Sequence, residues 1–122
     1  MRGASRRRPE QVAEVIRQVV AEAIAREVRD PRVGFLTITR VDVSGDLGHA
    51  VIHVSRPGED EDRRRALLGL RSASGFLRSR VAKALATRTV PELHFELDRG
   101  LEHAARIDAM LAELKREEEA GD

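Results

Sequence analysis

The chain has 122 residues and a formal net charge of +1, with 41% hydrophobic and 35% charged residues. This length suits one compact domain and is short for two, and the composition matches neither a membrane protein nor a disordered chain. The absence of cysteine excludes disulfides, thiol catalysis and thiolate metal ligands. We expect a cytoplasmic protein, because the basic N-terminus leads into an amphipathic pattern rather than the apolar stretch of a secretory signal.

The first predicted element is an amphipathic helix. Apolar residues recur at helical spacing from about Gln11 to Arg29, so one face of this segment is apolar along its length. We expect the helix to end at Asp30-Pro31, because proline lacks the N–H of the next helical hydrogen bond and disfavours helical geometry in the residue before it.

Two strands are predicted next. The stretch FLTITRVDV is rich in β-branched and apolar residues, and alternation in HAVIHVS places Ala50, Ile52 and Val54 on one side. Turn residues separate the two stretches, so we expect an antiparallel hairpin. In the first strand the apolar residues change parity between Ile38 and Val41, which predicts either a bulge near Arg40 or cover on both faces.

Two consecutive helices and a third strand follow. RPGEDEDRRR predicts a turn and an acid-rich helix start. Ala73-Ser74-Gly75 interrupts the helical pattern after it, so we expect two helices that meet at this point. Pro91 ends the unit, and LHFELD then predicts a strand with Leu93, Phe95 and Leu97 facing inward.

The last predicted element is a helix with apolar spacing between Leu101 and Leu114. The resulting order is helix, strand, strand, helix, helix, strand, helix. It predicts a single α+β domain in which helices cover one face of a three-stranded sheet. We expect a flexible basic arm at residues 1–8, the domain at residues 9–115 and a frayed acidic tail at residues 116–122.

Positive charge is concentrated in one part of the chain. No acidic residue occurs from Arg63 to Pro91, here called the basic segment, whereas acidic residues outnumber basic ones from Glu92 onward. This asymmetry suggests a protein that approaches a polyanion in one orientation. The alternative is an ordinary solvated helix face. The cations of the basic segment are Arg63, Arg64, Arg65, Arg71, Arg78, Arg80, Lys83 and Arg88.

The sequence offers little support for catalysis or for a metal site. His49 and His53 share one side of a strand, but four residues at about 3.4 Å each place them roughly 13 Å apart, too far to share an ion. We expect both on the open face of the sheet beside Val51. The sequence contains no nucleophile elbow, phosphate-cradling loop or metalloprotease helix. We therefore expect no enzymatic activity, cofactor, metal or small-molecule substrate.

Nucleic-acid binding is a better match to the basic segment. Its cations can neutralise phosphates and add a salt-sensitive contribution to binding. The chain has only three phenylalanines and no other aromatic ring apart from histidine. Because at least Phe95 is needed for the core, we expect recognition of backbone and shape rather than of base identity. Arg63, Arg64 and Arg65 are left out of this site, since acids at residues 59–62 lie one helical turn away.

A protein-interaction module is a third hypothesis. The acidic last helix or an exposed strand edge could meet a partner protein.

The order of elements resembles that of a type II KH domain, which binds RNA at the junction between two consecutive helices. The junction Ser72-Ala73-Ser74-Gly75 lacks the GxxG loop of ordinary KH domains. It is similar instead to the kinked Ala-x-Gly junction of the bacterial ribosome-binding factor A family. RDPRVGFLTITRVDVSGDLGHAVIHVS and LRSRVAKALATRTVPELHFELD resemble that family's paired-strand region and its Leu-Arg helix with Arg-x-x-Pro-x-Leu-x-Phe.

This resemblance covers roughly Arg6 to Leu114 and implies a function. The family consists of non-enzymatic assembly factors that bind the small ribosomal subunit during late maturation of 16S ribosomal RNA and support growth in the cold. The alternative is a general KH-type RNA chaperone that is not dedicated to the ribosome. The resemblance implies a cytoplasmic protein, which we expect to be a monomer without a membrane partner. The implied RNA-binding residues are Arg71, Ser72, Ala73, Ser74, Gly75, Arg78, Arg80 and Lys83.

Overall fold

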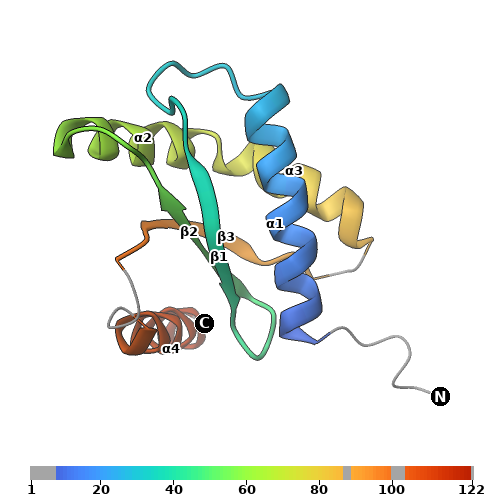
Figure 1. Ribbon diagram of the computed structural model, residues 1–122. Helices are drawn as coiled ribbons and strands as arrows, with labels where there is room; N and C mark the ends of the chain where they lie inside the picture. The colour runs from blue at the N-terminus through green and yellow to red at the C-terminus, as the bar shows by residue number, and fades with distance from the viewer. Residues whose placement is uncertain (1–7, 87–88, 100–103, 122) are drawn as a thin grey trace.

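A computed structural model describes residues 8–86, 89–99 and 104–121, and the side chains of residues 104–106 are not described (Figure 1). Apart from Arg8, the predicted basic arm lies outside the described residues, as does Arg88 of the basic segment. The elements follow the order α1, β1, β2, α2, α3, β3, α4. In the described part of the chain, no helix has the length and apolar character needed to cross a bilayer.

Helix α1 (Pro9–Arg26) starts with a proline in its first turn, where no N–H is required. The backbone N–H of Arg8 donates to the side chain of Gln11, 3.0 Å away. The helix ends earlier than the sequence predicts. The N–H groups of Glu27 and Val28 both donate to the carbonyl of Ala23, so the α-helical bonding pattern stops before the proline is reached.

The sheet has the order β1-β2-β3. Strands β1 (Thr37–Val43) and β2 (His49–Ser55) form the predicted antiparallel hairpin, and their register shifts between Ile38 and Arg40, which confirms the predicted bulge. Strand β3 (Glu92–Leu97) runs parallel to β2, with His49 opposite Glu92 and Val51 opposite His94. This parallel register brings together residues that lie more than 40 positions apart in the sequence.

Helices α2 (Asp60–Ser72) and α3 (Ser74–Leu85) form the consecutive pair, with acidic residues in the first turn of α2 as expected. Together with α1 they cover one face of the sheet, as Figure 1 shows. The core lies between these helices and that face, and Phe95 is buried in it as predicted. The other buried core positions are Val12, Ile16, Val20, Ala23, Val33, Ala50, Ile52, Val54, Leu70, Leu77, Val81, Leu85 and Leu93.

The opposite face of the sheet is not open. Helix α4 (Ala104–Ala120) packs against β2 on that side, and His49, Val51 and His53 are buried there. The predictions of helices on one face only and of exposed His49 and His53 were therefore wrong. Strand periodicity shows which residues share a face, but not what covers that face. Helix α4 also continues to Ala120, so most of the predicted frayed tail is helical.

Candidate nucleic-acid interface

The junction between α2 and α3 consists of a single non-helical residue, Ala73, with φ −90° and ψ 0°. Its N–H donates to the carbonyls of Gly69 and Leu70, and its carbonyl accepts from the N–H of Leu77. The hydroxyl of Ser74 donates to the carbonyl of Arg71 at 2.9 Å. Backbone hydrogen bonds therefore continue across the bend, which makes the junction a defined corner between two helices.

Gly75 does not cause this bend. It lies inside α3, it is not among the residues with positive φ, and a β-carbon built on it would meet no atom within 4 Å. The bend therefore does not depend on the conformational freedom of this glycine. Ala73 adopts the required backbone angles itself, since this region is allowed for residues with a side chain.

A different glycine has a packing role near the junction. A β-carbon on Gly69 would lie 2.8 Å from Cγ2 of Val33 and 3.4 Å from Cβ of Arg32. The loop after α1 therefore packs directly on α2. Arg32 also reaches the junction, because its guanidinium donates to the hydroxyl of Ser72 at 3.2 Å. Sequence reasoning missed this contact, which joins residues 40 positions apart.

Arg32 is held by Asp30. The guanidinium donates to both carboxylate oxygens, with a shortest distance of 2.6 Å, and the N–H of Arg32 adds a further bond to Oδ1. The side-chain hydrogen bonds from Arg32, followed by the backbone bond, lower the pKa of Asp30 to about 2. The carboxylate therefore remains charged over the whole physiological pH range.

We expect Arg32→Gln to raise the pKa of Asp30 toward the ordinary value of about 3.9, because the charged donor is lost while the backbone donor remains. In the unchanged chain, the stabilisation from this carboxylate is fully present above about pH 4 and is lost as the pH falls toward about 2. Carboxyl ¹³C chemical shifts during an acid titration measure this pKa. Arg29→Gln is the control, since Arg29 is exposed and adjacent to Asp30. An unchanged pKa in Arg32→Gln would contradict the assignment.

Arg78 and Arg80 extend to different sides of α3. The guanidinium of Arg78 donates to the carbonyls of Val90 at 2.7 Å and Pro91 at 3.2 Å, just before β3. Arg80 instead forms two hydrogen bonds with Glu27 at the end of α1, at 2.8 and 2.9 Å. The structure therefore does not gather these two cations at one point, and both have partners within the chain.

Two other predicted cations are less engaged by partners within the chain. Arg71, in the last turn of α2, is exposed, and its one hydrogen bond among the described residues, to the carbonyl of Phe95, is 3.5 Å long. Lys83 is also exposed, and no hydrogen bond or ion pair to it is found in residues 8–86, 89–99 and 104–121. It lies in the last turn of α3, roughly 12 Å along the helix from Gly75. The predicted site is therefore extended along α3.

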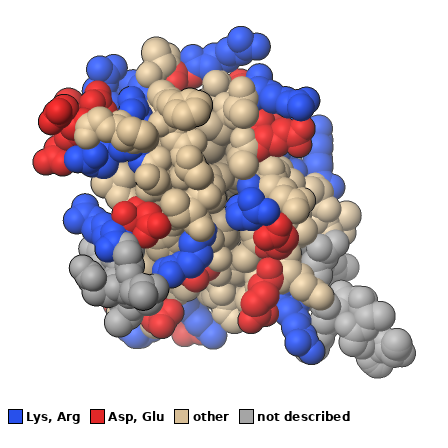
Figure 2. Space-filling model, viewed as in Figure 1, with Lys and Arg blue, Asp and Glu red and all other residues tan. Residues whose placement is uncertain are grey.

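The acids before the basic segment pair with its first arginines, as predicted. Arg63 contacts Asp60 and Arg64 contacts Glu61, each at 2.6 Å. Figure 2 shows blue and red side chains interspersed on the viewed face, with no continuous basic band there. On this face, cationic side chains are therefore interspersed with acidic ones.

Comparisons with known proteins decide the family. The family model of ribosome-binding factor A matches residues 8–111. The chain belongs to the ribosome-binding factor A family. A ribosome-binding factor A from Thermomicrobium roseum is 46% identical over 110 residues, which span 90% of this chain and 85% of the relative.

Two sets of coordinates from the family have a similar fold. A Thermotoga maritima protein assigned to ribosome-binding factor A has a TM-score of 0.68 and 35% identity, covering 76% of this chain and 89% of that one. A homology model of Thermus thermophilus ribosome-binding factor A, fitted into the cryo-electron microscopy map of its complex with the 30S subunit, has a TM-score of 0.57 and 30% identity. That match covers 69% of this chain and 88% of the other.

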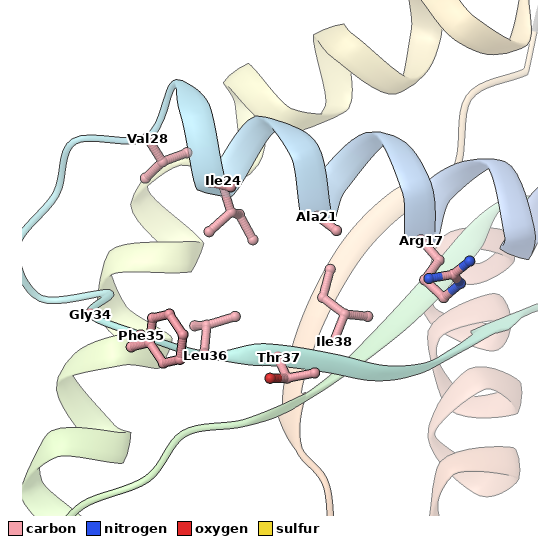
Figure 3. Close-up of a pocket in the computed structure, with 10 residues that line it drawn as sticks. Arg17, Ala21, Ile24, Val28, Gly34, Phe35, Leu36, Thr37 and Ile38 are labelled. Atoms are coloured by element: carbon pink, nitrogen blue, oxygen red, sulfur yellow. The ribbon is translucent and has the colours of Figure 1, made fainter.

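This family member also has an apolar groove between α1 and the start of β1. The groove has a volume of about 550 Å³, and in Figure 3 Ala21 and Ile24 of α1 face Leu36 and Ile38 across it. Phe35 lies at its edge and is 84% exposed. The sequence predicts Phe35 as the first residue of a strand, but β1 begins only at Thr37. Residue type alone does not show where a strand begins or whether a ring beside it is buried.

Proposed function

We propose that this chain binds the small (30S) ribosomal subunit in the cytoplasm and assists the late maturation of 16S ribosomal RNA, supporting growth in the cold. Family membership carries this proposal, together with the similarity to a Thermus thermophilus protein described in complex with the 30S subunit. The chain acts by binding, without making or breaking bonds. Preferential affinity for one conformation of the RNA shifts the folding equilibrium toward that conformation.

We further propose that the fold is a type II KH-like fold that acts as a monomer. A sheet in which β2 is antiparallel to β1 and parallel to β3 supports this assignment, as does the consecutive pair α2 and α3 with its sharp corner at Ala73. In this assignment the corner is the part that approaches the RNA.

The proposed RNA contacts follow from exposure together with weak engagement within the chain. Arg71 and Lys83 are the primary phosphate contacts, because both are exposed and only weakly engaged within the chain. Residues 72–75 form the corner that approaches the backbone. Arg78 and Arg80 contribute positive charge while holding α3 to the loop before β3 and to α1. Their guanidinium groups have further N–H donors that can point outward.

We expect the double change Arg71→Gln and Lys83→Gln to weaken binding to 30S subunits and to make it less dependent on salt. Two phosphate contacts are lost, so the negative slope of log affinity against log salt concentration becomes shallower by about two. Co-sedimentation with purified subunits over a salt series measures both quantities.

The matched control is Lys115→Gln with Arg116→Gln, which removes one lysine and one arginine from exposed positions on α4. If the phosphate contacts are made by Arg71 and Lys83, this control variant has the same salt dependence of 30S binding as the unchanged chain. Equal loss in both variants would show a non-specific charge effect and contradict the assignment of Arg71 and Lys83. Failure of the unchanged chain to sediment with 30S subunits would contradict the function itself.

A general RNA chaperone is the second candidate function. The isolated cations Arg71 and Lys83 favour it, because phosphate contacts carry no sequence information. Competition separates the two functions. Unrelated structured RNA displaces a general chaperone from 30S subunits at equal phosphate concentration, but it leaves a dedicated assembly factor bound.

A further inference from the structure

Four polar side chains meet where β2 and β3 begin, on the face that α4 covers. His49 comes from β2, Glu92 and His94 come from β3, and Glu118 comes from α4. Nδ1 of His49 lies 3.2 Å from Nε2 of His94, and Oε1 of Glu92 lies 3.8 and 4.0 Å from these two atoms. Two imidazoles and a carboxylate therefore present one potential ligand atom each to a common point.

These distances match what a small divalent cation requires. Bonds of about 2.0–2.1 Å from nitrogen to zinc place two ligand atoms of a tetrahedral site about 3.3 Å apart. The two imidazole nitrogens already have this separation. The carboxylate of Glu92 needs to move by less than about 1 Å, and its side chain is 64% exposed, so it has room to do so.

His49 provides a second and independent indication. Its side chain is only 5% exposed, and its Nε2 atom is buried without a hydrogen-bond partner among the described residues. The nearest carboxylate oxygen, Oε1 of Glu118, is 3.5 Å away. A metal on Nδ1 requires the proton of a neutral His49 to be on Nε2, where it faces Glu118. Metal-binding histidines commonly have such a carboxylate beside the other ring nitrogen.

We propose that His49, His94 and Glu92 form a binding site for a divalent transition metal of the zinc type, with Glu118 orienting His49. Two nitrogen donors and one carboxylate are a common donor set for zinc, and a fourth position remains for water. The exposed side of Glu92 gives the ion a route from solvent.

Metal binding at this point stabilises the packing of α4. This helix contacts the sheet at β2, and Glu118 connects its final turns to His49. A bound cation fixes His49, and through it the carboxylate on α4. The spacing argument that excluded a metal site concerned His49 and His53, which lie along one strand. The parallel register of β2 and β3 supplies His94 instead.

Calorimetric titration of the metal-free full chain with ZnCl₂ tests the site, and cobalt absorption reports the coordination geometry. We expect one zinc ion per chain and the intense visible bands of four-coordinate cobalt. Glu118→Gln weakens zinc binding about tenfold, and His94→Gln weakens it further. Glu92→Gln also weakens it, whereas the same change at Glu96 leaves the affinity unchanged. Glu96 is the matched control because it lies on the same strand and the same face.

A second measurement does not depend on the folding of variants. Imidazole ¹⁵N shifts of the unchanged chain show which ring nitrogens change on adding zinc, and we expect Nδ1 of His49 and Nε2 of His94. If adding zinc changes the ¹⁵N shift of neither nitrogen, the proposal is overturned, because the two imidazoles then share only a hydrogen bond. Absence of stoichiometric binding, or equal zinc affinity in the folded His94→Gln chain, overturns it as well.

Discussion

Phe95→Ala is expected to destabilise the domain by about 3–5 kcal/mol, a large part of the total stability of a domain of this size. Phe95 is 1% exposed and lies in the core between the sheet and helices α1 to α3. Removing its ring loses buried apolar surface and leaves a cavity that rigid neighbours fill only in part. Chemical denaturation followed by circular dichroism measures the free energy of unfolding.

Phe35→Ala is the matched control, since the same atoms are removed from a residue that is 84% exposed. We expect this change to alter the free energy of unfolding by less than about 0.5 kcal/mol. A similar loss in the two variants would contradict the assignment of the core. If Phe35→Ala weakens 30S binding while stability is unchanged, the exposed ring belongs to the binding surface.

Gly69→Ala is expected to destabilise the domain by about 1–3 kcal/mol, the usual cost of overpacking a core. The added methyl group would lie 2.8 Å from Cγ2 of Val33, whose side chain is itself buried. Either the loop after α1 or α2 must shift, and this loop carries the Arg32 contact to Ser72 at the corner. Thermal and chemical unfolding measure the loss.

Gly75→Ala provides the contrast on α3. Because a β-carbon there meets nothing within 4 Å, alanine should leave stability unchanged or raise it by up to about 1 kcal/mol through its higher helix propensity. The two glycines lie six positions apart in helices on either side of the corner. A strongly destabilised Gly75→Ala chain would show that the corner does depend on this glycine.

The two glycines also separate a role in folding from a role in binding. If Gly75→Ala is stable but binds 30S subunits less well, the open surface at residue 75 is needed for close approach of RNA. If both stability and binding are unchanged, the glycine of the Ala-x-Gly junction is not needed for either property in this chain. The corner itself is defined by the hydrogen bonds of Ala73 to Gly69, Leu70 and Leu77.

Local sequence patterns determined the elements of this fold. Helical spacing marked α1, alternation marked β2 and β3, and the change of parity between Ile38 and Val41 marked the bulge in β1. The pairing of Arg63 and Arg64 with acids one turn away was predictable for the same reason. Each of these features depends on residues close together in the chain, whose relative positions follow from helix or strand geometry.

Only the tertiary structure decided what the elements cover and which side chains they bring together. Arg80 meets Glu27, 53 positions away, and so is not a free cation. His49 meets His94 through the parallel register of two strands, under a helix that the sequence placed on the other face. Periodicity specifies the direction of a side chain from its own element. The partner it meets depends on how distant elements pack, and that is a property of the whole fold.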